Sequence, residues 1–372
     1  MKIAILVSKL TGGGAERVAA LWAMGFAERG HEVFFILDST LPQYITYPIP
    51  KSVKMYSIGS NIRFNILRSV MNRIRRIIGY RNFKLSRILK TTYPDVVIGV
   101  LHPWASQALK ATKGMSVKII NTEHNSFERP TCAPMNFKVY QEKFFENRNF
   151  DHVTVLTKAD LQVIDNRLKN VSILPNPLPF RVETEIPAKQ NVILAAGRLD
   201  AWYIKGFDML IRAWGEICHL YPDWELHIPR TGEKHSYQYL RDLASGKGIA
   251  EEQIKFLGFS KDMCPIYKRS SIFVLSSRCE GFGMVLVEAM SQGCACIACD
   301  YKGRQSEILT EASQGIICPT EDVEALRKAM IRMITDDDYR ILCQHNAIER
   351  SKFYSLDRTI DRWEEIFKKL NL

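Results

Sequence analysis

Residues 272–288 read IFVLSSRCEGFGMVLVE, and this stretch joins two hydrophobic patterns. The continuous apolar run Ile272–Leu275 is typical of a buried strand, and a helix is expected to start near Gly283. Gly281 and Gly283 allow a sharp turn and let a ligand approach the backbone closely. The backbone N–H groups of Phe282, Gly283 and Met284 are then expected to point outward at a helix N-terminus. Such a terminus is a ready site for a diphosphate.

Two carboxylates flank this turn. Glu280 precedes it, and Glu288 lies about one turn inside the helix. Carboxylates repel a phosphate but accept hydrogen bonds from hydroxyl groups, so we expect one to contact a transferred sugar and the other a ribose. The alternative is a capped helix with incidental acidic residues.

A second polar stretch, Gly197-Arg198 to Lys205-Gly206, precedes this motif by one strand–helix pair. Arg198 leaves the end of a strand, and Lys205 comes just before a helix. Arginine donates as a planar fork and lysine acts as a point charge, so the two side chains could hold one diphosphate. Cations in loops are usually only solvated, but the position of this stretch favours a site.

The two halves of the chain share one plan. Lys2–Val7 leads through Thr11–Gly14 to a helix, and residues 191–196 lead through Gly197 to another. Strands that alternate with helices predict βαβ units and parallel sheets. The proline-rich segment Leu174–Phe180 is incompatible with a helix, so we place a domain boundary there: residues 1–180 precede it, and a second α/β domain follows from residue 181.

The loop Gly12-Gly-Gly14 resembles a dinucleotide-binding fingerprint, with Asp38 placed where it could bind a ribose. The third glycine of that fingerprint is missing, and Glu16 lies near the position of the pyrophosphate. We therefore interpret the loop as one that closely approaches a ligand held by the other domain. An NAD-dependent oxidoreductase remains an alternative.

Composition indicates an ordinary globular protein, with 46% hydrophobic and 24% charged residues. No apolar run approaches the roughly 18 residues that span a bilayer. The short run after Lys2 is better interpreted as a strand than as a signal peptide, so we expect a cytoplasmic protein. Cys294, Cys296 and Cys299 fit a buried strand better than a zinc site, because no second pair lies nearby.

The net charge of +11 is concentrated in Asn61–Lys90, which contains nine basic residues and no acidic one. Its apolar residues fall at helical spacing, with Arg68, Arg75 and Arg76 on the opposite side. This pattern predicts an amphipathic helix that docks on an anionic membrane surface. A solvated basic face is the alternative. Nucleic acid is a less suitable partner, because no motif that would contact bases or a groove accompanies the positive charge.

Taken together, the motifs resemble those of retaining glycosyltransferases of family 4. Glu280 to Glu288 matches the form E-G-F-G-x-x-x-x-E, and Thr122-Glu-His124 and Pro175-Asn-Pro follow the order of that family. The resemblance implies a GT-B fold, in which two Rossmann-like domains with parallel sheets face a central cleft. It also implies a C-terminal domain over residues 181–352, and a crossover helix within 353–372, around Trp363, that returns to the N-terminal domain.

The resemblance also assigns roles. Arg198 and Lys205 would hold the donor diphosphate, Glu280 the transferred sugar and Glu288 the ribose. The amides of Phe282, Gly283 and Met284 would bind phosphate, Gly14 would approach it from the N-terminal domain, and His124 would lie near the sugar and the acceptor hydroxyl. No metal or other cofactor is implied, because cations and a helix dipole stabilise the leaving diphosphate.

Two departures from the family pattern stand out. Arg230 occupies the position of a glycine expected beside the nucleotide, and Arg304-Gln-Ser-Glu307 replaces the more usual G-x-x-E. The resulting prediction is a metal-independent, retaining enzyme that moves a hexose or N-acetylhexosamine from a nucleotide sugar, with a UDP-sugar as the expected donor. Its expected acceptor is a lipid-linked or polysaccharide glycan at the cytoplasmic face of a membrane. A non-catalytic nucleotide-sugar-binding protein is a further alternative.

Overall fold

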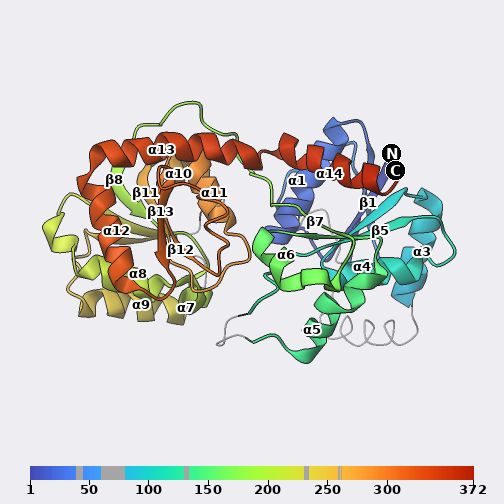
Figure 1. The fold of residues 1–372 in the computed structure, drawn as a ribbon, viewed down its shortest axis with the longest axis horizontal. Helices are drawn as coiled ribbons and strands as arrows, with labels where there is room; N and C mark the ends of the chain where they lie inside the picture. The colour runs from blue at the N-terminus through green and yellow to red at the C-terminus, as the bar shows by residue number, and fades with distance from the viewer. Residues whose placement is uncertain (39–44, 60–79, 130–133, 230–233, 259, 261) are drawn as a thin grey trace. The chain divides into compact units, whose positions relative to one another are not determined.

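Apolar segments that alternate with helices form two parallel sheets in the computed structural model, which describes residues 1–38, 45–59, 80–129, 134–229, 234–258, 260 and 262–372. The chain divides into two units. Unit 1 comprises Met1–Glu128, Pro134–Pro179 and Leu356–Leu372, and unit 2 contains Phe180–Ser355. Each unit has its own sheet and core (Figure 1).

Unit 1 contains a seven-stranded sheet in the order β3-β2-β1-β4-β5-β6-β7. Every strand pair in it is parallel. Its elements are β1 (Lys2–Val7), α1 (Gly14–Glu28), β2 (Glu32–Leu37), β3 (Lys54–Ser57), α3 (Tyr80–Thr92), β4 (Val96–Val100), α4 (His102–Ala111), β5 (Lys118–Thr122), α5 (Phe137–Phe144), η2 (Glu146–Asn149), β6 (His152–Val155), α6 (Lys158–Ile164), η3 (Asp165–Arg167), β7 (Val171–Ile173) and α14 (Leu356–Lys369).

Unit 2 contains a six-stranded parallel sheet in the order β10-β9-β8-β11-β12-β13. Its elements are β8 (Gln190–Leu194), η4 (Leu199–Ala201), α7 (Trp202–Lys205), α8 (Phe207–Gly215), η5 (Cys218–Leu220), β9 (Glu225–Pro229), α9 (Lys234–Gly246), β10 (Ile254–Leu257), α10 (Cys264–Arg269), β11 (Ser270–Leu275), α11 (Met284–Ser291), β12 (Ala295–Asp300), β13 (Gly315–Pro319), α12 (Val323–Thr335), α13 (Asp337–Ser351) and η6 (Lys352–Tyr354).

Both sheets have the strand order of Rossmann-like, doubly wound folds, so the predicted α/β fold class is confirmed. In each unit the first strand lies between the second and the fourth. The second and third strands extend the sheet on one side of it, and the later strands extend it on the other side. β3 and β7 were not predicted from the sequence pattern. Both are edge strands, of four and three residues, and they lack the continuous apolar run of a central parallel strand.

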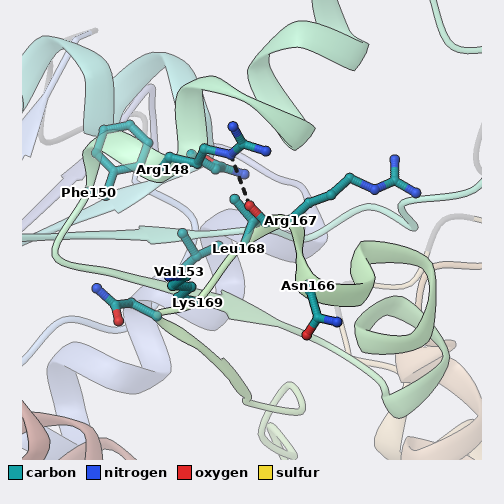
Figure 2. A pocket seen from close by; sticks show the side chains of 9 residues that line it. Arg148, Phe150, Val153, Asn166, Arg167, Leu168 and Lys169 are labelled. Atoms are coloured by element: carbon teal, nitrogen blue, oxygen red, sulfur yellow. Dashed lines mark hydrogen bonds between the residues drawn. The ribbon is translucent and has the colours of Figure 1, made fainter.

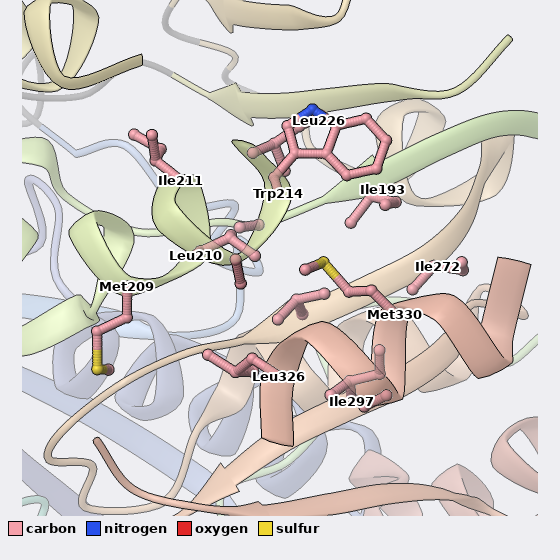
Figure 3. Packing of buried hydrophobic residues seen from close by; sticks show 14 of the residues in the cluster. Ile193, Met209, Leu210, Ile211, Trp214, Leu226, Ile272, Ile297, Leu326 and Met330 are labelled. Carbon is pink, nitrogen blue, oxygen red and sulfur yellow. The ribbon is translucent and has the colours of Figure 1, made fainter. Parts of the chain in front are cut away.

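Helices cover the unit 2 sheet through one apolar core. Trp214 and Leu210 of α8 and Met330 of α12 pack against the strand residues Ile193 and Ile297, all of them buried (Figure 3). Cys296 and Cys299 lie in β12, Cys294 immediately precedes it, and Cys299 is part of this core. Cys294, Cys296 and Cys299 are each 0% exposed, which confirms that this stretch is a buried strand.

The last helix in the sequence, α14, packs on the first, α1, within unit 1 (Figure 1). Trp363 meets Trp22 edge-to-face at 5.1 Å between ring centroids and Phe26 at 5.8 Å. Gly25 permits this approach, because a Cβ atom there would lie 2.5 Å from Cγ1 of Ile360. The apolar face of α14 is therefore part of the unit 1 core.

Candidate active site

The loops that carry the predicted donor residues follow two adjacent strands of unit 2. Arg198 and Lys205 come after β8, and Glu280 to Met284 come after β11. β8 and β11 are neighbours in the sheet, and the strand order reverses between them. Ligands of open α/β sheets bind outside the carboxyl ends of strands at such a reversal, so the fold brings these two loops to the expected edge.

A glycine contact joins the two loops. Gly206 has φ 65°, and a Cβ atom added to it would lie 1.9 Å from the carbonyl oxygen of Ser276. The hydroxyl of Ser276 donates to the carbonyl of Lys205 at 2.9 Å, and the amide of Arg278 donates to the carbonyl of Ile204 at 2.8 Å. A side chain at position 206 would force the loops apart, so only glycine fits here.

Arg278 clamps the same two loops with its side chain. Its guanidinium donates to both carboxylate oxygens of Asp208 at 2.7 and 2.9 Å, and to the carbonyl of Tyr203 at 2.6 Å. Bidentate arginine–carboxylate pairs fix orientation as well as distance. Neither Arg278 nor Asp208 was assigned a role from the sequence. Asp208 did stand out in the sequence, because it ends the stretch Lys205-Gly-Phe-Asp. The spacing of residues alone does not identify Arg278 as its partner.

Lys205 and Glu280 form an ion pair in the joined loops. Nζ of Lys205 lies 2.5 Å from Oε1 of Glu280, which also accepts a hydrogen bond from the hydroxyl of Ser277 at 2.9 Å. The Lys205 and Glu280 side chains are 23% and 12% exposed, so both remain within reach of a ligand. The structure thus brings together a predicted phosphate-binding cation and a predicted sugar-binding carboxylate.

The turn beside this pair ends at the N-terminus of α11. Gly283 caps the helix with φ 94°, in the left-handed region that favours glycine. Within the described part of the chain, the N–H groups of Phe282, Gly283 and Met284 have no acceptor in the protein. Free amides at a helix N-terminus, together with the helix dipole, favour an anion.

Arg198 and Glu288, the other donor-binding residues predicted in unit 2, lie in different environments. The Arg198 side chain is 74% exposed, with Nε 3.8 Å from the carboxylate of Asp200, so its guanidinium is accessible to a ligand. Glu288 is buried in α11 and accepts a hydrogen bond from the hydroxyl of Tyr267 at 3.1 Å. Its predicted contact with a ribose stays a prediction.

In unit 1, Gly14 is the first residue of α1. The preceding Gly13 has φ 130° and caps the helix, and its carbonyl accepts a hydrogen bond from the hydroxyl of Tyr47 at 2.9 Å. The loop therefore ends at a helix N-terminus, as the sequence predicted. That Gly14 contacts phosphate stays a prediction.

His124, the other predicted catalytic residue, follows β5 in unit 1. Its Nε2 lies 3.1 Å from the hydroxyl of Thr122, and its ring lies 5.6 Å from that of Trp22. Burial lowers the pKa of His124 to about 4, although the carboxylate of Glu123 and the side chain of Asn176 raise it. The imidazole is therefore neutral at pH 7, and its unprotonated nitrogen can accept a hydrogen bond.

A buried ion pair supports the loop that carries His124. The carboxylate of Glu123 and the ammonium of Lys143 lie 3.2 Å apart, and both residues are 4% exposed. Burial raises the pKa of Glu123, but Lys143 and the amides of Asn121 and Asn147 outweigh it, so the pKa lies below its ordinary value. Lys143 also donates to the carbonyls of Asn125 and Ser126, at 2.9 and 3.2 Å, which fixes this loop.

A hollow of about 430 Å³ in unit 1 lies away from these residues (Figure 2). Arg148, Phe150, Arg167 and Lys169 contribute to its lining, and Nε of Arg148 donates to the carbonyl of Arg167 at 2.9 Å. These segments precede β6 and β7, whereas His124 follows the carboxyl end of β5. The hollow is therefore at the opposite edge of the parallel sheet from the predicted site.

Comparisons with known proteins identify the family of this chain. The family model "Glycosyl transferases group 1" matches residues 179–350, and the model "Glycosyltransferase Family 4" matches residues 12–180. The chain belongs to glycosyltransferase family 4. The predicted enzyme class is therefore confirmed.

Similar proteins of this family extend over the full chain. The amylovoran biosynthesis glycosyltransferase AmsD of Erwinia amylovora is 27% identical, with 98% of this chain and 99% of AmsD covered. A GalNAc-alpha-(1->4)-GalNAc-alpha-(1->3)-diNAcBac-PP-undecaprenol alpha-1,4-N-acetyl-D-galactosaminyltransferase of Campylobacter jejuni is 24% identical, with 100% of this chain and 99% of that enzyme covered. The crystal structure of S. aureus TarM with UDP superposes with a TM-score of 0.79 at 12% identity, covering 98% and 99%, which shows the GT-B fold.

Part of the basic segment of this glycosyltransferase is described, namely α3. Arg87 and Lys90 are exposed there, Phe83 is 67% exposed, and Arg81 forms an ion pair with Asp38. Arg68, Arg75 and Arg76 lie outside the described residues, as does Arg230. No helix among the described residues is long and apolar enough to cross a membrane.

The buried ion pair predicts a large effect on stability. Replacing Lys143 with Met leaves Glu123 as an uncompensated buried charge, so the free energy of unfolding should fall by about 3–5 kcal/mol. Urea denaturation followed by circular dichroism measures this change. Lys138→Met is the control, because Lys138 is 85% exposed beside Glu142, and it should cost less than about 0.5 kcal/mol. Similar losses in both variants would contradict the assignment.

The burial of His124 predicts a pH dependence. Histidine NMR should show His124 titrating near pH 4 in the folded protein and near 6.5 in urea, with His124→Gln used for assignment. Because the pKa of His124 is lower in the folded than in the unfolded protein, the free energy of unfolding is highest above pH 6.5. It should decrease as the pH falls from 6.5 toward 4. His152, whose pKa burial also lowers to about 4, should behave alike. Titration of His124 near 6.5 in the folded protein contradicts the buried environment.

Proposed function

We propose that this glycosyltransferase moves a hexose or N-acetylhexosamine from a UDP-sugar to a lipid-linked or polysaccharide glycan, with retention of the anomeric configuration. The observation that carries the proposal is the contact of Lys205 with Glu280 beside the free amides of α11. It places cationic, N–H and carboxylate groups within one pair of loops. A nucleotide sugar presents a diphosphate and sugar hydroxyls, which need these groups.

The donor diphosphate is proposed to lie at the N-terminus of α11. Lys205 would exchange part of its contact with Glu280 for a phosphate oxygen, and the exposed Arg198 would add forked donation. Glu280 would then accept a hydrogen bond from a hydroxyl of the sugar. The TarM structure, whose fold is similar, was solved with UDP, which supports UDP as the nucleotide to test first.

The reaction is proposed to need no metal ion, because the protein itself supplies positive charge at the leaving group. The bond between the sugar C1 and the diphosphate oxygen breaks, and a bond from C1 to the acceptor oxygen forms on the same face. The acceptor proton passes to the departing diphosphate oxygen, so no protein nucleophile takes part. Lys205, Arg198 and the amides of Phe282, Gly283 and Met284 stabilise the charge that develops on that oxygen.

The acceptor proposal follows the named activities of relatives. AmsD acts in amylovoran biosynthesis, and the Campylobacter enzyme transfers N-acetylgalactosamine to an undecaprenol-diphosphate-linked glycan. A polyprenyl-diphosphate-linked glycan is therefore the acceptor class to test first. The neutral His124 remains our prediction for a residue that contacts the sugar and the acceptor hydroxyl.

The dinucleotide interpretation of the N-terminal loop is weaker than this proposal. Asp38, which could have held the ribose of NAD, is ion-paired with Arg81. Glu16 lies in the first turn of α1, where its charge opposes a pyrophosphate. Absence of nicotinamide binding would agree with our interpretation.

The donor assignment is tested with Glu280→Gln. Losing the carboxylate should lower sugar transfer by about 100-fold, because contacts to charge developing in the transition state have this order of effect. Transfer and donor hydrolysis are measured with a panel of UDP- and GDP-hexoses, and the anomeric configuration of the product by NMR. Activity should survive EDTA.

Glu349→Gln is the matched control, since Glu349 pairs with Lys352 at 2.6 Å on the surface of unit 2. It should leave transfer unchanged. Near-normal turnover of Glu280→Gln would remove the site assignment. A wild-type protein that binds UDP but neither transfers nor hydrolyses any donor would instead be a nucleotide-sugar-binding protein.

We also propose that the basic segment 61–90 docks this enzyme on an anionic membrane surface. Arg87, Lys90 and Phe83 of α3 combine exposed positive charge with an exposed ring. Basic residues near an anionic surface contribute about 1 kcal/mol each, and an aromatic ring inserts at the headgroup level.

Vesicle sedimentation tests this docking. A variant carrying Phe83→Ser, Arg87→Gln and Lys90→Gln should bind vesicles with 30% phosphatidylserine about 30-fold more weakly, because the two basic residues contribute roughly 1 kcal/mol each. Lys110→Gln with Lys113→Gln removes two exposed charges elsewhere in unit 1 and serves as the control. Equal binding by wild type and the α3 variant would favour a solvated basic face.

A further inference from the structure

Residues 301–307 contact the turn at the start of α11. Within this segment, Arg304 to Glu307 is the stretch that departs from the family pattern. Gln305 is fully buried, and its side chain makes two hydrogen bonds with the backbone. Oε1 accepts from the amide of Tyr301 at 2.7 Å, and Nε2 donates to the carbonyl of Phe282 at 3.3 Å. Because Oε1 faces an N–H donor, the orientation of the Gln305 amide is fixed.

This contact sets the direction of a peptide bond in the anion site. The peptide that joins Phe282 to Gly283 is trans, since the described chain contains no cis bond. In a planar trans peptide the C=O and N–H groups point in opposite directions. With the Phe282 carbonyl directed at Gln305, the N–H of Gly283 must point away from Gln305. Glycine at 281 and 283 would otherwise leave this peptide free to rotate.

The Phe282 side chain is held by the same part of unit 2. Its ring packs edge-to-face against Tyr354, with ring centroids 5.5 Å apart. The hydroxyl of Tyr354 donates to the carbonyl of Glu307 at 3.3 Å, and Arg350 donates to the same carbonyl at 2.8 Å. The carbonyl and the ring of Phe282 are thus both fixed by residues that touch the 301–307 loop.

The geometry points to Gln305 as a positioning residue for the donor diphosphate, acting through the Phe282–Gly283 peptide, with Tyr354 holding the Phe282 ring. Gln305 keeps the Gly283 amide turned toward the phosphate before the donor arrives. The inference rests on the proposed function, because it supposes a diphosphate at the α11 terminus. It adds a residue that shapes affinity for the diphosphate without touching it.

A comparison of UDP with uridine separates this role from general loosening of the fold. Uridine lacks the diphosphate, so it should not sense the Gly283 amide. Gln305→Met keeps the side-chain volume but removes both hydrogen bonds. Calorimetry should show that this variant binds UDP about tenfold more weakly than the wild type does, because a hydrogen bond to a charged group is lost. The affinity for uridine should be unchanged. GDP and guanosine replace this pair if the wild type prefers GDP.

Gln314→Met is the matched control. Gln314 is also buried in unit 2, and its Oε1 accepts from the amide and hydroxyl of Thr310, at 2.9 and 3.2 Å. Its loss should leave the ratio of the UDP and uridine dissociation constants unchanged. If the Gln305 variant folds poorly, a second pair of variants tests the same role. Tyr354→Leu should raise the ratio of the UDP to the uridine dissociation constant, whereas Tyr354→Phe, which keeps the ring, should not.

The outcomes distinguish the two proposals. UDP affinity that is unchanged in Gln305→Met and Tyr354→Leu, or UDP and uridine weakened equally, overturns the positioning role alone. A wild-type protein that binds neither UDP nor GDP overturns the proposed function, and this inference with it.

Discussion

The proposed donor site depends on the close approach of Gly206 to the carbonyl of Ser276. Two loops from neighbouring parallel strands meet there with no room for a side chain, and the bidentate pair of Arg278 with Asp208 fixes them beside the contact. Only because the loops are joined does the end of α7 deliver Lys205 to Glu280. Lys205 and Glu280 could each be solvated separately, but the joined loops hold them in contact. The arrangement therefore does not require a ligand.

The fold could be predicted because its signals are local. Apolar runs alternating with helical stretches determine βαβ units, and Gly281 and Gly283 mark a turn whatever surrounds it. The residues that brace the site were not predictable in this way. Gln305 acts on Phe282, and Arg278 on Asp208, across 23 and 70 positions of sequence, and nothing in residue type or spacing identifies such partners. β3 and β7 were missed because short edge strands lack a continuous apolar pattern.

Burial and charge act differently in the two units. In unit 1, a buried lysine and glutamate fix the loop before His124, and burial keeps the imidazole neutral. In unit 2, the paired lysine and glutamate remain partly exposed. A buried pair serves rigidity, since separating its members is costly, whereas an accessible pair can exchange partners with a ligand. The same two residue types therefore suit a structural role in one unit and binding in the other.

The packing of α14 on α1 has a consequence for biosynthesis. Trp22 and Phe26 are synthesised before unit 2, but the residues that cover them, Trp363 and Phe367, are synthesised after it. Unit 1 therefore cannot complete its core during translation until the whole of unit 2 has emerged. During that interval the apolar side of α1 stays exposed to solvent and to chaperones, and a chain truncated before Leu356 would leave it exposed permanently.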